Sequence, residues 1–184
     1  MAELFWHFLI YSVLGFLLEV VFARITRSDK QDRKCMILFP LCPVYGLGAL
    51  AIVHLPAAVQ RSPLLLFLMG GLAATAVEYV TDWFYETVLG VRFWDYSDRM
   101  WNLKGRVSLL FSIFWGFLAL SLVTWVHPPV TDLISAIPAG LFLPALFLFL
   151  TDGILSAVTL RAAGTTDALR WYDRFRTEKK KTNG

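Results

Sequence analysis

The stretch that decides the fold begins at residue 64 and reads Leu64-Leu65-Leu66-Phe67-Leu68-Met69-Gly70-Gly71, and it stays largely apolar as far as Gly90. It is long enough to cross a bilayer, which takes about 20 apolar residues in a helix. Glu78, Asp82 and Glu86 are spaced four apart within it, so a helix places all three carboxylates on one face. One central Asp costs roughly 2.5–3.5 kcal/mol on insertion scales. We therefore expect this face to meet other helices or water instead of lipid.

Composition supports the same class of protein. The chain has 184 residues, of which 57% are apolar and only 17% charged, whereas soluble domains are about 25% charged. The apolar runs are continuous and lack the alternation of a membrane β-barrel. We predict an all-α polytopic membrane helix bundle in one domain, residues 1–160, with a basic cytoplasmic tail at 161–184. Its five transmembrane helices are expected at 4–23, 36–55, 64–90, 107–126 and 137–160.

Prolines are expected to disturb or end three of these spans, and in the fifth Pro138 and Pro144 soften the helix. Pro40 and Pro43 lie in the first half of the second span, which we expect to be unwound or re-entrant because proline removes backbone donors. The run His127-Pro128-Pro129 is expected to end the fourth span.

The distribution of basic residues predicts the orientation. Of the 17 lysine and arginine residues, all except Arg61 fall in the loop after the first span, the loop after the third span, or the tail. The positive-inside rule then places these three segments in the cytoplasm and the N-terminus outside. This orientation brings Glu19, Glu78, Asp82, Glu86 and Asp152 into the cytoplasmic half of the bundle.

These carboxylates are the candidate functional groups. Tyr11, Gly15 and Glu19 share one face of the first span, and ionisable groups inside a membrane are functional candidates by default. We expect Glu19 and the third-span carboxylates to line a cytoplasm-facing vestibule. The alternative is structural: Glu19 pairs with Arg92 or Arg106 and pins helices together, and Asp152 satisfies neighbouring helices.

The segment after the acidic helix carries further candidates, Trp94-Asp95-Tyr96-Ser97 and Asn102-Leu103-Lys104-Gly105-Arg106. Arginine can hold a carboxylate or a phosphate through two parallel hydrogen bonds. Arg106 therefore either neutralises Glu86 or Glu19, or receives an anionic headgroup. Asn102 and Gly105 resemble the entry of the fourth helix, where Asn caps and Gly allows close approach.

The cysteines and histidines predict no cofactor. Cys35 and Cys42 flank the start of the second span on its cytoplasmic side, where we expect reduced thiols. His7, His54 and His127 fall at outer ends of spans and could approach one another, but no ligand spacing supports a metal or haem site. The basic tail is expected to meet anionic lipid. No nucleic-acid module is visible.

Several ordered motifs resemble a known family. Phe39-Pro40-Leu41-Cys42-Pro43-Val44-Tyr45-Gly46-Leu47-Gly48-Ala49-Leu50 is similar to the Pro-Leu-Cys-Pro element of the bacterial ABC-transporter permease family of the CmpB type. Over about residues 8–128 the other signatures follow in order: Tyr11-Ser12 with Leu14-Gly15 and Glu19, Glu78-Tyr79 with Glu86, Trp94-Asp95-Tyr96-Ser97 with Asn102 and Gly105, and Ser112 with Trp115-Gly116. The chain departs from the family pattern at Asp32-Arg33-Lys34 and at Phe39.

The resemblance implies a small multi-pass transport permease of the inner (plasma) membrane. With the residue patterns it yields a predicted site for a proton, cation or cationic solute: Glu19, Glu78, Asp82, Glu86, Tyr11, Tyr45, Trp94, Asp95, Tyr96, Asn102 and Arg106. The chain has no Walker A loop, so any ATPase would be a separate subunit. Beyond the lipid bilayer, we expect a homo-oligomer or larger membrane complex as partner. An intramembrane enzyme or binding protein for a lipid or amphiphile headgroup, and a purely structural subunit, are the alternatives.

Overall fold

The computed structural model describes residues 1–27 and 34–170, and this part of the chain is mostly helical. The helices are α1 (Ala2–Ile25), α2 (Pro43–Val53), α3 (Ala57–Gln60), α4 (Pro63–Phe84), α5 (Leu109–Ser121), α6 (His127–Ser135) and α7 (Phe142–Ala163). Two π-helical turns extend them, η1 (Tyr85–Leu89) after α4 and η2 (Leu122–Val126) between α5 and α6. Two 3₁₀ turns flank α7, η3 (Ala139–Leu141) and η4 (Thr166–Leu169). The short antiparallel strands β1 (Asn102–Leu103) and β2 (Val107–Ser108) form a hairpin before α5.

Within the described residues, four continuous helical segments are long and apolar enough to cross a membrane: Ala2–Ile25, Pro63–Leu89, Leu109–Ser135 and Ala139–Ala163. They correspond to the first, third, fourth and fifth predicted spans. The prediction of five transmembrane helices is confirmed for these four only, because the second span contains the short helix α2.

The first half of that second span is unwound, as its prolines indicate. Helix α2 begins at Pro43, and residues 35–42 adopt no regular structure. Polar groups of α7 take up the exposed backbone donors: both Asp152 oxygens accept from Leu38 N, Asp152 Oδ2 accepts from Phe39 N at 2.9 Å, and Ser156 Oγ accepts from Ile37 N at 2.9 Å. Non-helical backbone at membrane depth needs such partners, because lipid offers none.

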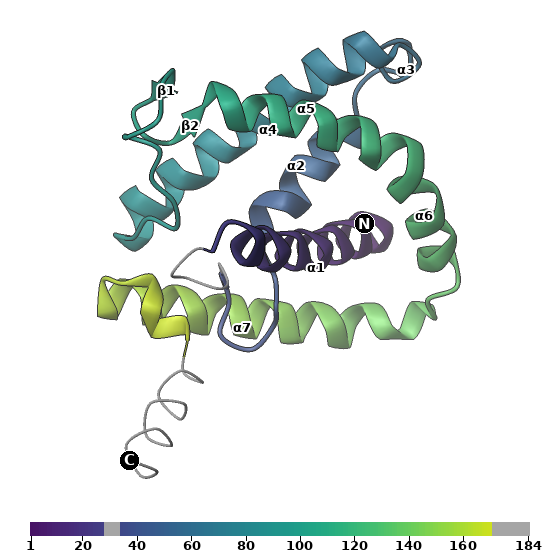
Figure 1. The fold of residues 1–184 in the computed structure, drawn as a ribbon. Helices are drawn as coiled ribbons and strands as arrows, with labels where there is room; N and C mark the ends of the chain where they lie inside the picture. The colour runs from purple at the N-terminus through teal and green to yellow at the C-terminus, as the bar shows by residue number, and fades with distance from the viewer. Residues whose placement is uncertain (28–33, 171–184) are drawn as a thin grey trace.

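The fourth predicted span is longer than expected. Helix α5 continues through η2 into α6 and ends at Ser135, so the run at residues 127–129 does not stop it. The wide π-helical turn comes immediately before the prolines, and Pro128 lies in the first turn of α6, where a missing N–H costs no further helical hydrogen bond. Figure 1 shows that the chain bends between α5 and α6 toward α7.

Small residues bring α4 and α5 into close contact. A Cβ atom added at Gly116 would lie 2.9 Å from the carbonyl oxygen of Phe67, and one added at Gly71 would lie 3.1 Å from the carbonyl oxygen of Ser112. Membrane helices commonly associate through such small residues, because burial of apolar surface gains little in lipid. Helix α2 packs against both α1 and α4, and Figure 1 shows α1 and α2 between the α4–α5 pair and α7.

The segments predicted to be cytoplasmic are described in part. Residues 28–33 and 171–184 lie outside the described range, and with them most of the predicted basic tail. The start of that tail belongs to the folded body: α7 extends to Ala163, Arg161 donates to the carbonyl oxygen of Val88 at 2.5 Å, and Leu169 is buried.

Candidate functional site

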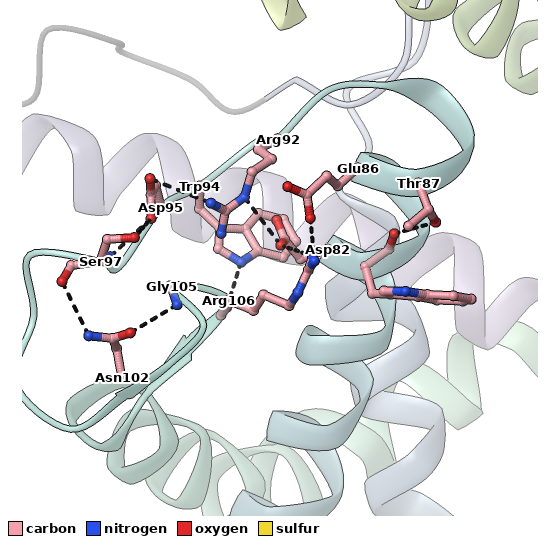
Figure 2. Close-up of polar contacts among 11 residues, drawn as sticks. Asp82, Glu86, Thr87, Arg92, Trp94, Asp95, Ser97, Asn102, Gly105 and Arg106 are labelled. Atoms are coloured by element: carbon pink, nitrogen blue, oxygen red, sulfur yellow. Dashed lines mark hydrogen bonds and ion pairs between the residues drawn. The ribbon is translucent and has the colours of Figure 1, made fainter.

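Two of the three aligned carboxylates of α4 and η1 form an ion-pair network (Figure 2). Arg106 Nη1 lies 2.7 Å from Asp82 Oδ2, and Arg106 Nη2 pairs with Glu86. Arg92 Nε lies 3.4 Å from the same Asp82 oxygen. The Asp82 side chain is fully buried, whereas 43% of the Glu86 side chain is exposed. Of the two roles considered for Arg106, the structure shows neutralisation of Glu86, and it adds Asp82.

The β-hairpin places Arg106 against the acidic helix. The backbone at Gly105 has φ +68°, and a Cβ atom there would lie 2.4 Å from Ser97 Oγ, so the turn requires glycine. Asn102 Oδ1 accepts from Gly105 N at 2.9 Å, and Trp94 Nε1 donates to the carbonyl oxygen of Arg106 at 2.9 Å (Figure 2). The prediction that Asn102 caps the fourth helix is wrong, because this side chain closes the hairpin turn and Ser108 is the N-cap residue of α5.

Asp95 belongs to the exposed side of the same loop. It accepts hydrogen bonds from Ser97 N at 2.9 Å and from Ser97 Oγ at 2.6 Å. These bonds to Ser97 hold the pKa of Asp95 below its usual value, and the charge of Arg92 adds to the effect. Asp95 therefore shapes the loop, and Arg92 links it to the buried Asp82, because Arg92 Nη1 lies 3.5 Å from Asp95 Oδ2.

Glu78, the third carboxylate of the stripe, has different partners. Tyr96 Oη donates to Glu78 Oε1 at 3.0 Å, and Trp115 Nε1 donates to Glu78 Oε2 at 3.0 Å. Glu78 is only 5% exposed. Two aromatic side chains from a loop and from α5 thus orient a carboxylate that α4 carries into the bundle.

Glu19 of α1 is held in the same manner. Tyr45 Oη, from the first turns of α2, donates to Glu19 Oε1 at 2.8 Å. Tyr45 reaches this position because Gly15 leaves room: a Cβ atom at Gly15 would lie 2.2 Å from the Tyr45 side chain. The Tyr45 and Trp115 rings lie 5.0 Å apart, so the donors to Glu19 and to Glu78 are in contact.

A cavity of about 250 Å³ connects these two groups. Glu19 and Glu78 are the two carboxylates among its lining residues, and the rest of the wall is mainly aromatic and aliphatic. The aromatic residues that line it are Phe22, Tyr45, Phe93, Trp94, Tyr96, Phe111, Phe114, Trp115 and Phe117. The arrangement brings carboxylate oxygens and aromatic side chains together in one cavity.

Comparison with known proteins gives one result. A family model described as "Putative ABC-transporter type IV", of the CmpB type, matches residues 6–157. The chain belongs to this ABC-transporter family. The matched region includes every residue that lines the cavity. No curated protein and no solved structure matches the chain.

In this ABC-transporter family member the predicted site residues separate into four groups. Glu19, Tyr45, Glu78, Trp94 and Tyr96 line the cavity. Asp82, Glu86 and Arg106 form the ion-pair network beside it. Asp95 and Asn102 shape the hairpin loop. The fourth group is Tyr11 alone, whose hydroxyl lies 2.5 Å from His127 Nδ1.

The outer histidines of the chain only partly come together. The rings of His7 and His127 lie 5.3 Å apart, and His7 Nε2 contacts Thr131 Oγ1 at 3.3 Å. His54 instead contacts the carbonyl oxygen of Leu50, in its own helix. Among the described residues, no group of three or more His, Cys, Asp or Glu is arranged to hold a metal ion. Cys35 and Cys42 are buried thiols with sulfur atoms 3.7 Å apart.

Sequence reasoning did not assign the roles of two residues of the site: it named Trp115 only in a family motif and Arg92 only as a possible partner of Glu19. Trp115 holds Glu78, and Arg92 shares Asp82 with Arg106. A signal existed for Trp115, because an indole N–H inside a span needs an acceptor and Glu78 was the nearest charged group at that depth. For Arg92 there was none, since its position depends on the path of the loop after η1.

Proposed function

We propose that the chain is the membrane-spanning part of a transport system, and that it binds a cationic solute or a proton in the cavity between Glu19 and Glu78. One observation carries this proposal: two carboxylates from different helices, each oriented by an aromatic donor, open into the same cavity of about 250 Å³. Membership of an ABC-transporter family supports the transport role.

The chemistry of the wall favours a positive charge. Carboxylate oxygens attract a cation directly, and the faces of Trp and Tyr rings add about 0.5–2 kcal/mol where water is excluded. Trp94, Trp115 and Tyr45 all contribute to this wall. Asp82 and Glu86 are not among the residues that line the cavity, so of the four predicted carboxylates the proposed site keeps Glu19 and Glu78.

The topology that goes with this role has five crossings, with the N-terminus outside and the C-terminus in the cytoplasm of an inner-membrane protein. The second crossing consists of the unwound segment 35–42 followed by α2, and the other four are continuous helices. Discontinuous spans of this kind commonly form the substrate sites of transporters. Energy from ATP would require a separate ATPase subunit, and a chain of this size would act as a homo-oligomer or in a larger complex.

The test uses the purified protein in nanodiscs and in proteoliposomes with tetraethylammonium as the cation probe. Binding and uptake are compared for the wild type, Glu19→Gln, Glu78→Gln and the control Asp132→Asn, which removes an exposed carboxylate outside the cavity. We expect each glutamine variant to lose at least tenfold in affinity and the control to change by less than twofold. Equal behaviour of all four proteins, or no binding and no proton movement in the wild type, would contradict the proposal.

The apolar wall gives some support to the second candidate, a protein or enzyme that acts on a lipid or amphiphile headgroup at the cytoplasmic face. This function would use Arg106 to hold the phosphate of the headgroup, but both terminal nitrogens of the guanidinium already pair with Asp82 and Glu86. Native mass spectrometry of the protein in lipid distinguishes the two functions, because a retained phospholipid favours the second candidate.

A further inference from the structure

A second cavity of about 250 Å³ adjoins the first. The two share part of their walls, and the shared residues come from α1, α2 and α5: Leu18, Tyr45, Trp115, Leu118 and Ser121. The second cavity continues along α1 and η2 toward the end of the protein that carries Tyr11 and Val126. The two cavities lie end to end along these shared residues, among them Tyr45 and Trp115, whose ring centroids lie 5.0 Å apart.

The two cavities differ in polarity. The first cavity contains Glu19 and Glu78, whereas among the residues that the structure describes no Asp, Glu, Lys, Arg or His lines the second. Its polar atoms are also engaged elsewhere: Tyr11 Oη contacts His127, Tyr45 Oη donates to Glu19, and Ser121 Oγ donates to the carbonyl oxygen of Phe117. The second cavity therefore presents carbon surface, and the pair of cavities is charged at one end and apolar at the other.

The pair of cavities also opens toward lipid. Helix α1 packs on α2 and α6 while α5 packs on α4, which leaves a groove between α1 and α5. Lining side chains from both sides of this groove are partly exposed: Leu14 by 40%, Leu18 by 39%, Phe114 by 44% and Phe117 by 57%. A molecule dissolved in the bilayer can enter the groove sideways, without crossing water.

From these observations we propose a substrate class for the site: a single-chain amphiphilic cation, such as a long-chain amine or alkylammonium, taken directly from the membrane. Its positive headgroup lies between Glu19 and Glu78, and its hydrocarbon tail passes Tyr45 and Trp115 into the second cavity. This inference rests on the proposed function, since it assigns a tail-binding region to the same cation site.

The tail region can be blocked without touching the carboxylates. Leu14 of α1 and Leu122 of η2 line only the second cavity, from opposite walls. Leu14→Trp and Leu122→Trp each fill it with a larger side chain, and two independent variants guard against a folding defect in one of them. Leu143→Trp on α7 is the matched control, because Leu143 is 70% exposed and lines neither cavity.

The experiment compares tetramethylammonium with dodecyltrimethylammonium, in nanodiscs and below the micelle concentration, with empty nanodiscs as the partition blank. Hydrocarbon already dissolved in lipid gains little from entering a protein, so the informative quantity is the difference between variants at each chain length. We expect each blocking variant to lower the affinity for dodecyltrimethylammonium at least tenfold and to change the affinity for tetramethylammonium by less than twofold. The control should change neither affinity.

Position is tested with an alkylammonium that carries a diazirine at the end of its tail. After irradiation, mass spectrometry should find saturable labelling in residues 122–126 or at Tyr11, abolished by excess dodecyltrimethylammonium. Labelling restricted to lipid-facing residues of α7, or equal binding of the dodecyl probe by all variants, would overturn the tail site while binding of tetramethylammonium still upheld the cation site. Failure of both probes in the wild type would instead remove the proposed function itself.

Discussion

At the scale of single residues, Arg106 pairs with two of the three carboxylates on the acidic helix. It is 12% exposed and bonds the fully buried Asp82 as well as the half-exposed Glu86. Removal of one partner from a buried ion pair typically costs about 3–5 kcal/mol, because the other charge is left uncompensated. An exposed pair contributes about 0–1 kcal/mol. The two contacts of Arg106 are therefore unequal.

This difference gives a stability prediction. Arg106→Gln should lower the free energy of unfolding more than Glu86→Gln does, because it leaves the fully buried Asp82 with only Arg92, 3.4 Å away. Glu86→Gln should cost no more than about 1 kcal/mol. Unfolding in a graded denaturing detergent measures both, and Asp82→Asn combined with Arg106→Gln should recover part of the loss. Equal losses in the two single variants would show that Asp82 is not the main partner.

Residue types in the sequence were enough to identify the buried carboxylates, but not to assign their partners. The spacing of Glu78, Asp82 and Glu86 correctly put them on one helix, yet the π-helical turn η1 and the hairpin divide them between an ion-pair network and a cavity. Asp152 shows the same limit. Its burial was foreseeable, whereas its partners, the N–H groups of Leu38 and Phe39, lie more than a hundred residues away in the chain.

At the scale of elements, the contact between α4 and α5 sets the position of the cavity wall. Gly116 lies where α5 passes the backbone of Phe67, and Trp115, one residue earlier, reaches Glu78. The predicted span boundaries gave both helices but not their separation, because hydropathy reports length in the membrane and not which faces meet. This contact explains the motif: Gly116 allows the close approach of α4, and Trp115 bonds Glu78.

A substitution at Gly116 tests the contact. Gly116→Ala adds a Cβ atom 2.7 Å from the Phe67 ring and 2.9 Å from its carbonyl oxygen, so the helices must separate. We expect a loss of about 1–3 kcal/mol in unfolding free energy, the usual range for overpacking. Gly140→Ala is the control, since nothing lies within 4 Å of its added Cβ atom. A thermal unfolding midpoint that is unchanged at Gly116 would indicate that α4 and α5 are not held this closely.

At the scale of the whole molecule, five crossings were predicted and four long helices are present in the described residues. The unwound segment 35–42 together with α2 is the candidate for the remaining crossing. Its prolines predicted the break, but a single sequence gives no sign that α7 would supply the missing hydrogen-bond acceptors. If this segment and α2 form one crossing, α3 would lie at the outer surface and the β-hairpin at the cytoplasmic surface. The positive-inside rule predicts the same arrangement from the distribution of basic residues.

Cysteine labelling in intact cells tests that arrangement. Ala58 in α3 and Asp98 in the hairpin loop are both exposed, whereas the native Cys35 and Cys42 are 6% and 2% exposed and should react slowly. A membrane-impermeant maleimide should label Ala58→Cys from outside, and should label Asp98→Cys only after the membrane is permeabilised. If the segment turned back to the cytoplasmic side instead of crossing, α3 and the hairpin would be labelled in the opposite order. The cavity would then open toward the other face, and the direction assigned to the cation site would reverse with it.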